Sequence, residues 1–172
     1  MKRLILLTSI FCAASMASAQ GDKVYFGGGF GLNFSSEYTN LSASPLVGYR
    51  VTDQFSVGVS VTYQYIKIKS IDQSFNSTGG SLFTRFLFTD EIFAHAEFER
   101  LNYDQIVVFT NGDFTETRKA NNALLLGGGY RQPMGRNASF SVLGLYDVLW
   151  KSAETSPYSE PWQIRAGVAV GF

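Results

Sequence analysis

The stretch that decides the fold is WQIRAGVAVGF, residues 162–172, in which apolar side chains alternate with small or polar ones. The apolar set is Trp162, Ile164, Ala166, Val168, Val170 and Phe172. The intervening set is Gln163, Arg165, Gly167, Ala169 and Gly171. Because successive side chains of a β-strand point to opposite faces, this pattern predicts a strand with one apolar face. About ten such residues are the length that crosses a membrane as one strand of a β-barrel.

The same alternation recurs in residues 55–66 and leaves two kinds of barrel open. The apolar set is Phe55, Val57, Val59, Val61, Tyr63 and Tyr65. The polar or small set is Ser56, Gly58, Ser60, Thr62 and Gln64. A transmembrane barrel turns the apolar set toward lipid and keeps the polar set inside. The alternative is a soluble periplasmic barrel that binds an apolar ligand and buries Phe55, Val57, Val59 and Tyr63.

Aromatic spacing favours the membrane. Three pairs of aromatic residues stand ten positions apart on one predicted strand face: Phe55 and Tyr65, Phe140 and Trp150, Trp162 and Phe172. Ten tilted strand residues span roughly 23 Å along a membrane normal, close to the apolar band of about 25 Å between the aromatic belts of membrane barrels. We therefore predict an aromatic girdle that comprises Phe55, Tyr65, Phe140, Trp150 and Trp162.

Eight strand-like segments can be counted along the chain. They are residues 24–34, 43–51, 55–66, 80–88, a fifth that begins at 92, a sixth that ends near 131, 139–150 and 161–172. The links after the second, fourth and sixth are short, and the other links are longer and polar, as in barrels with short periplasmic turns and long outer loops. The sequence predicts an all-β, eight-stranded antiparallel up-and-down transmembrane β-barrel with a filled lumen.

The N-terminal residues 1–19 have the form of a secretory signal peptide, which leaves residues 20–172 as the barrel domain. Lys2 and Arg3 precede an apolar run, and Ala17-Ser18-Ala19 provides a small-residue cleavage site. A lipoprotein signal at Cys12, the only cysteine, is the alternative. Removal of these 19 residues takes two of 14 basic residues and none of 14 acidic ones, which leaves a net charge of −2 and no support for nucleic-acid binding. No later apolar run is long enough for a transmembrane helix.

Charged side chains are expected inside the barrel. Strand parity places Arg50, Arg85, His95, Glu97, Glu99, Arg131, Asp147 and Arg165 on inward faces. An eight-stranded barrel is just wide enough to be filled by side chains, and arginine can hold a carboxylate with two hydrogen bonds. We interpret the set as a structural network of paired charges that closes the lumen. A narrow ion or proton path is the alternative.

The sequence predicts no catalytic residue, no cofactor site and no metal site. His95 is the only histidine, and there is no G-x-S-x-G motif. The glycine runs 27–29 and 127–129 lack the following helix that a phosphate loop requires. The rival hypothesis is a lipid A-modifying enzyme, which would need a serine and an acid grouped with His95 on the lipid face near the outer leaflet.

Residues 104–118 predict a hairpin that protrudes from the barrel. Asn111-Gly112 between strand-forming runs is a strong turn signal. Strand parity requires facing residue numbers with an even sum, and a three-residue loop that pairs Phe109 with Asp113 satisfies this. Ile106, Val108, Phe109 and Phe114 are apolar for an exposed loop. We expect them to capture an extracellular protein partner; packing against residues 35–42 and 67–78 is the alternative.

Taken together, the signal peptide, the eight strands, the alternating link lengths and terminal Phe172 resemble the small bacterial outer-membrane β-barrel family, the OmpX-like and OmpA-like barrel domains. The resemblance implies a location in the cell outer membrane and contact with its lipid bilayer. It also implies that Phe172, Val170 and Val168 form a signal for the barrel-assembly machinery. Members of the family serve mostly as scaffolds, adhesins or resistance factors. We expect a monomer without catalysis, with a structural or surface-interaction role and without a periplasmic peptidoglycan-binding domain.

Overall fold

The computed structural model describes residues 23–34, 38–68, 73–108, 114–135, 137–152, 156, 158 and 160–171. The predicted signal peptide and Phe172 lie outside these ranges. The strands are β1 (Val24–Phe34), β2 (Tyr38–Arg50), β3 (Phe55–Ile68), β4 (Gln73–Leu87), β5 (Ile92–Val108), β6 (Phe114–Met134), β7 (Ala138–Asp147) and β8 (Trp162–Val170). Within the described ranges no helix is long and apolar enough to cross a membrane.

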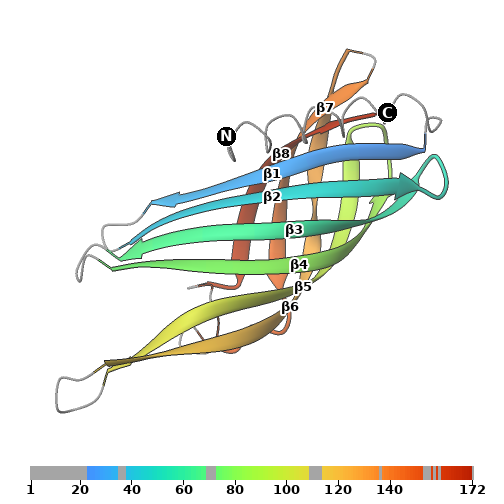
Figure 1. Ribbon diagram of the computed structural model, residues 1–172. Helices are drawn as coiled ribbons and strands as arrows, with labels where there is room; N and C mark the ends of the chain where they lie inside the picture. Colours follow the sequence, from blue (N-terminus) through green and yellow to red (C-terminus); the bar gives the residue numbers. More distant parts are fainter. Residues whose placement is uncertain are drawn as a thin grey trace.

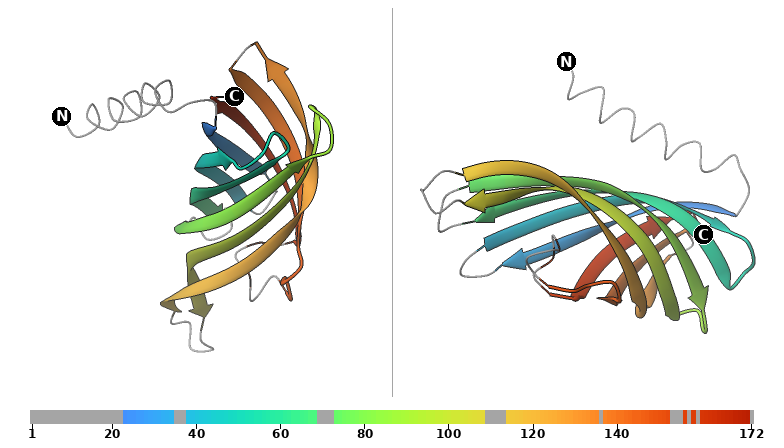
Figure 2. Two further views of the ribbon diagram at one scale, coloured as in Figure 1. Left: turned by 90° about the vertical axis from the view of Figure 1, so that its right-hand side faces the viewer. Right: turned by 90° about the horizontal axis from the view of Figure 1, so that it is seen from below.

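The strands form one closed barrel in chain order, each antiparallel to its neighbours (Figure 1). β1 closes the barrel on β8 through a ladder that runs from Phe26↔Val170 to Phe30↔Ala166. Closure pairs both edges of the sheet and leaves a curved wall around a single interior (Figure 2). The predicted eight-stranded antiparallel up-and-down barrel is confirmed.

Apolar side chains cover the outside of the barrel and polar ones line much of the inside. In β3, Val59 and Tyr63 are exposed, whereas Ser60 and Thr62 are buried. In β8, Ile164 is 80% exposed. The interpretation as a soluble barrel that buries Phe55, Val57, Val59 and Tyr63 is therefore wrong. The apolar face is the outer one because the interior holds the serine, threonine and charged side chains of the alternating pattern.

Several strands extend further than their side-chain pattern predicts. β2 begins at Tyr38 instead of residue 43, and β4 begins at Gln73 instead of residue 80. Both extensions pair with β3, which continues to Ile68. The ladder satisfies the backbone amides and carbonyls there whatever the side chains are. Residues 38–42, 67–68 and 73–78, which we expected to lie in loops, are therefore strand.

One strand is shorter than predicted, which changes part of the aromatic girdle. β7 ends at Asp147, and a turn at Val148 and Leu149 follows it. Trp150 therefore lies in the link between β7 and β8, where its indole Nε1 donates to the Tyr158 carbonyl oxygen at 3.2 Å. Its ten-residue distance from Phe140 is not a distance along one strand face.

Two of the short turns share one threonine-centred design. Thr52 Oγ1 accepts a hydrogen bond from Phe55 N at 2.9 Å, and Thr89 Oγ1 accepts one from Ile92 N at 3.0 Å. Both threonines precede an aspartate, Asp53 or Asp90. A threonine side chain that bonds the backbone two or three residues later is a common way to fix a turn. These turns define the short-turn end of the barrel.

Inward glycines make room for inward aromatic rings. A Cβ at Gly48 would overlap the Tyr25 ring. A Cβ at Gly58 would overlap both the Phe83 ring and the Val47 carbonyl oxygen. Tyr25 and Phe83 are buried and belong to one apolar cluster with Ala169. The width of an eight-stranded barrel thus requires that a large side chain on one strand faces a missing side chain on another.

Replacement of Gly58 by alanine should lower the free energy of unfolding by about 1–3 kcal/mol, because the added methyl group overpacks the lumen against Phe83. The matched control is Gly144→Ala, since a Cβ at Gly144 meets no atom within 4 Å. Both variants can be measured by urea unfolding of the refolded barrel. Equal midpoints for the two variants would contradict this view of the lumen.

Candidate functional site

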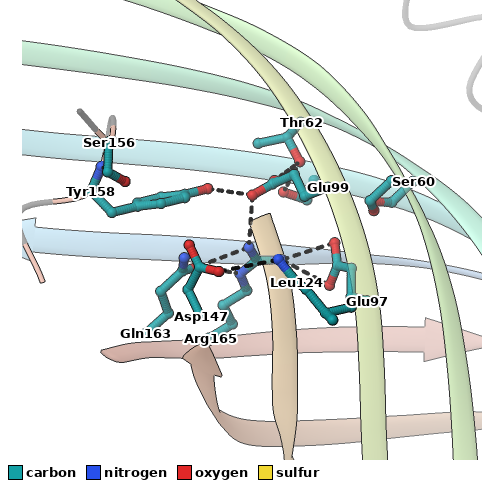
Figure 3. A network of polar contacts seen from close by, with 12 residues as sticks. Ser60, Thr62, Glu97, Glu99, Leu124, Asp147, Ser156, Tyr158, Gln163 and Arg165 are labelled. Atoms are coloured by element: carbon teal, nitrogen blue, oxygen red, sulfur yellow. Dashed lines mark hydrogen bonds and ion pairs between the residues drawn. The ribbon is translucent and has the colours of Figure 1, made fainter. Parts of the chain in front are cut away.

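The interior contains an ion-pair cluster centred on Arg165 of β8, which lies between Glu97 and Glu99 of β5 (Figure 3). Arg165 Nη1 donates to Glu97 Oε2 at 3.1 Å and to Glu97 Oε1 at 3.3 Å. Nη2 lies 3.6 Å from Glu99 Oε2 and donates to Gln163 Oε1 at 2.8 Å. One guanidinium therefore lies between two carboxylates that would otherwise repel each other, an arrangement that suits the planar arginine fork.

Glu99 is 0% exposed, and its remaining hydrogen bonds come from two hydroxyl groups. Thr62 Oγ1 donates to Oε1 at 3.1 Å, and the Tyr158 hydroxyl donates to Oε2 at 2.6 Å (Figure 3). Tyr158 belongs to the link between β7 and β8. Burial and the neighbouring Glu99 carboxylate raise the pKa of the Tyr158 phenol well above its usual value, so the hydroxyl remains a donor. The Tyr158–Glu99 hydrogen bond therefore attaches the β7–β8 link to a side chain of the lumen.

His95 is buried in the same cluster. Its Nε2 lies 3.1 Å from Glu97 Oε2, and its ring stacks on the Phe83 ring with centroids 5.5 Å apart. It pairs across the ladder with Gly127 and lies on an inward face, as strand parity predicts. The imidazole therefore faces the lumen and not the outer wall. Among the described residues, no group of three or more histidine, cysteine, aspartate or glutamate side chains could hold a metal ion.

Asp147 has a different role from the one we predicted. It is buried, but its Oδ1 accepts hydrogen bonds from the backbone amides of Leu124 at 3.1 Å and Leu149 at 3.0 Å. β7 ends at this residue, and amides beyond the end of a ladder need another acceptor. Asp147 therefore caps the end of β7 and is not a carboxylate partner for a lumen arginine.

The other three arginines lie toward the short-turn end of the barrel. Arg50, Arg85 and Arg131 line one cavity there. The Arg85 guanidinium carbon lies 4.4 Å from the centroid of the Phe93 ring and 5.9 Å from that of Phe83. The single network expected from the sequence is thus divided. A carboxylate-rich cluster surrounds Arg165, and an arginine-rich cluster occupies the short-turn end.

The β5–β6 ladder continues beyond the barrel wall as a two-stranded ribbon, which we define as residues 103–108 and 114–119 (Figure 1). The described β4 pairs reach β5 only as far as Asn102, and the described β7 pairs reach β6 only as far as Leu125. The outermost pair is Val108↔Phe114. This register has the predicted even sum. Residues 109–113 and the side chains of Ile106, Val108 and Phe114 lie outside the described part.

Some residues of the lumen clusters could not be found from sequence alone. Thr62 and Gln163 were predicted to point inward, but nothing in the pattern indicates which charge each would contact. Tyr158 stands in a link without periodicity, so no signal placed it beside Glu99. The stacking of Arg85 on Phe93 requires a knowledge of rotamers as well as of strand faces.

The comparisons with known proteins support the fold. No protein-family profile and no curated protein sequence matches the chain. The N-terminal β-barrel domain of Pseudomonas aeruginosa OprF is similar, with a TM-score of 0.52, 14% identity, and coverage of 89% of this chain and 100% of that one. Neisserial surface protein A (NspA) is similar, with a TM-score of 0.51, 19% identity, and coverage of 87% and 96%. At these identities the likeness shows a shared fold.

Replacement of Arg165 by glutamine should lower the free energy of unfolding by about 3–5 kcal/mol, because it leaves Glu97 and Glu99 buried without a cation. The control is Arg118→Gln, an exposed arginine whose loss should change stability by less than about 0.5 kcal/mol. Adding Glu97→Gln to the Arg165 variant should restore part of the loss. A double variant no more stable than Arg165→Gln alone would exclude the coupling.

Replacement of Tyr158 by phenylalanine should lower the free energy of unfolding by about 1–3 kcal/mol, because a buried acceptor of Glu99 loses its shortest hydrogen bond. Tyr63→Phe is the matched control, since the Tyr63 hydroxyl bonds Asn76 Oδ1 at an exposed site. Urea midpoints of the two variants measure the difference. If they coincide, Tyr158 does not attach the link to the lumen.

Proposed function

We propose that this protein is an integral outer-membrane β-barrel, a monomer without catalysis, that interacts with an extracellular protein through its β5–β6 ribbon. The observation that carries the membrane location is the apolar outer wall. Exposed apolar side chains occur on every strand of the barrel, among them Phe30, Leu41, Val61, Leu82, Phe98, Leu126, Val142 and Ile164. Soluble monomers rarely expose contiguous apolar patches larger than a few hundred Å².

Aromatic side chains near both ends of the wall support the same location. Phe86, Phe88 and Tyr130 are exposed near the short-turn end. Tyr146 and Trp162 are exposed near the other end, with ring centroids 4.6 Å apart. Belts of aromatic residues at the two membrane interfaces are a property of transmembrane barrels. Of the predicted girdle, Phe140 is exposed, and Phe55 and Tyr65 are partly exposed.

The name of one similar structure, Neisserial surface protein A, supports a surface location, which we extend to this chain as part of the proposal. We propose that residues 1–19 direct export and that residues 20–172 form the barrel. Val168 and Val170 are exposed on the outer face of β8, where the barrel-assembly machinery would read them together with Phe172.

The position of His95 favours a role without catalysis. A lipid A-modifying enzyme would present its histidine, serine and acid to the outer leaflet, whereas His95 is buried between Glu97 and Phe83. The polar contacts of the lumen instead support a structural role for the interior.

The ribbon is the best candidate for interaction because it extends the ladder away from the wall. Among the described residues, β5 beyond Asn102 and β6 before Leu125 pair only with each other. From Asp104 onward in β5 and before Leu125 in β6, each strand therefore has one edge that pairs with no strand in the described part of the chain. Such an edge can recruit a strand from a partner protein by hydrogen-bond addition.

Replacement of Val61, which is 62% exposed in the middle of β3, by arginine tests the membrane location. A charge on the lipid face near the bilayer midplane should lower the free energy of unfolding of the barrel in vesicles by about 2–4 kcal/mol. Ala120→Arg, at the base of the ribbon, is the control and should have little effect. A Val61 variant as stable as wild type would indicate that this wall faces water.

Deletion of residues 105–117, with a two-residue Asn-Gly turn in their place, tests the surface role separately. Cells that display the shortened barrel should lose adhesion to surfaces coated with extracellular proteins, because the free strand edges are gone. A band that changes its mobility on SDS gels when the sample is boiled shows that the shortened barrel still folds. Unchanged adhesion by a folded deletion variant would contradict the proposed role of the ribbon.

A further inference from the structure

The short-turn end of the barrel contains a cavity that no residue of the Arg165 cluster lines. Its volume is about 150 Å³, and Arg50, Arg85 and Arg131 contribute to its walls. The threonine-centred turns form its rim, with Asp53 and Asp90 exposed there. Three cations thus converge on a space bounded by two surface carboxylates.

Arg85 is the deepest charge in this cavity, only 8% exposed. Among the described residues its guanidinium makes no hydrogen bond or ion pair, and its Nε is buried without a partner. Its contacts are the rings of Phe93 and Phe83. Aromatic rings attract a cation, but they do not replace the acceptors that guanidinium N–H groups require. A buried cation of this kind needs an anion.

The buried carboxylates of the lumen are engaged elsewhere. Glu97 is held by Arg165 and His95, and Glu99 is held by Arg165, Thr62 and Tyr158, as described above. Asp147 caps backbone amides at the far end of β7. The three arginines that line the cavity exceed its two rim aspartates by one positive charge. The excess lies at the buried end, where Arg85 is.

We propose that this cavity is a binding site for a small oxyanion of the phosphate class. Guanidinium groups hold phosphate oxygens with paired hydrogen bonds, and three of them line the site. Tyr25 and Ser56, whose hydroxyl oxygens lie 3.1 Å apart, line it as well and add neutral donors. Since one water needs roughly 10–15 Å³ of such space, the cavity is large enough for a tetrahedral anion. The site is independent of the membrane location and of the ribbon.

The test uses the refolded barrel in a maltoside detergent, whose headgroup contains no phosphate. Inorganic phosphate is titrated while the Nε–Hε resonance of Arg85 is followed by NMR, with chloride as the reference anion. Phosphate should give a saturable shift of this resonance, and chloride should not. Arg85→Gln should weaken phosphate binding at least about tenfold, measured calorimetrically, because a charge-assisted contact is lost. Arg118→Gln removes the same charge from an exposed site and should leave the affinity unchanged.

Absence of a saturable shift, or an equal response to chloride, would overturn the proposal, as would unchanged affinity in a folded Arg85→Gln variant. If that variant does not fold, Arg50→Gln and Arg131→Gln provide the same comparison, with a similar loss expected for each. Vesicles that contain phosphatidate then distinguish the source of the phosphate group. Competition with inorganic phosphate assigns the site to a lipid headgroup, and lack of competition assigns it to the free anion; both results keep the oxyanion site.

Discussion

Closure of the backbone ladder is the constraint on which the rest of the structure depends. Once β8 pairs with β1, the edges of the sheet are satisfied, and the interior has a width that only side chains can fill. Every inward position must then match the strand opposite. Gly48 therefore faces Tyr25 and Gly58 faces Phe83. The buried carboxylates Glu97 and Glu99 likewise lie beside Arg165.

The same constraint separates charge along the barrel. Carboxylates gather around Arg165 toward the middle of the lumen, where hydroxyl groups from β3 and the β7–β8 link complete their contacts. Arg50, Arg85 and Arg131 line a cavity at the short-turn end. The interior therefore contains a negative cluster that is satisfied within the protein and a positive cluster that is open to a ligand from outside.

Side-chain alternation shows which face of a strand a residue occupies, and this limits what could be predicted from the sequence. It identified the faces of β3 and β8, and strand parity predicted the inward face of His95 and the register of the ribbon. Alternation fails where backbone pairing alone extends a strand, as in the first residues of β2 and β4. It also fails for contacts that depend on an irregular link, which is why Tyr158 was not anticipated and Trp150 was misplaced. Asp147 was placed correctly inside, but its partners are backbone amides at the end of a strand, which no side-chain pattern records.

The most direct measurement is the location and folded state of the full-length chain in a Gram-negative host. The outer-membrane fraction is isolated and run on SDS gels with and without boiling. A band in that fraction that shifts on boiling is the predicted result, because a closed barrel resists SDS until it is heated. A protein found in the periplasm without detergent, with no shift, would contradict a wall that faces lipid.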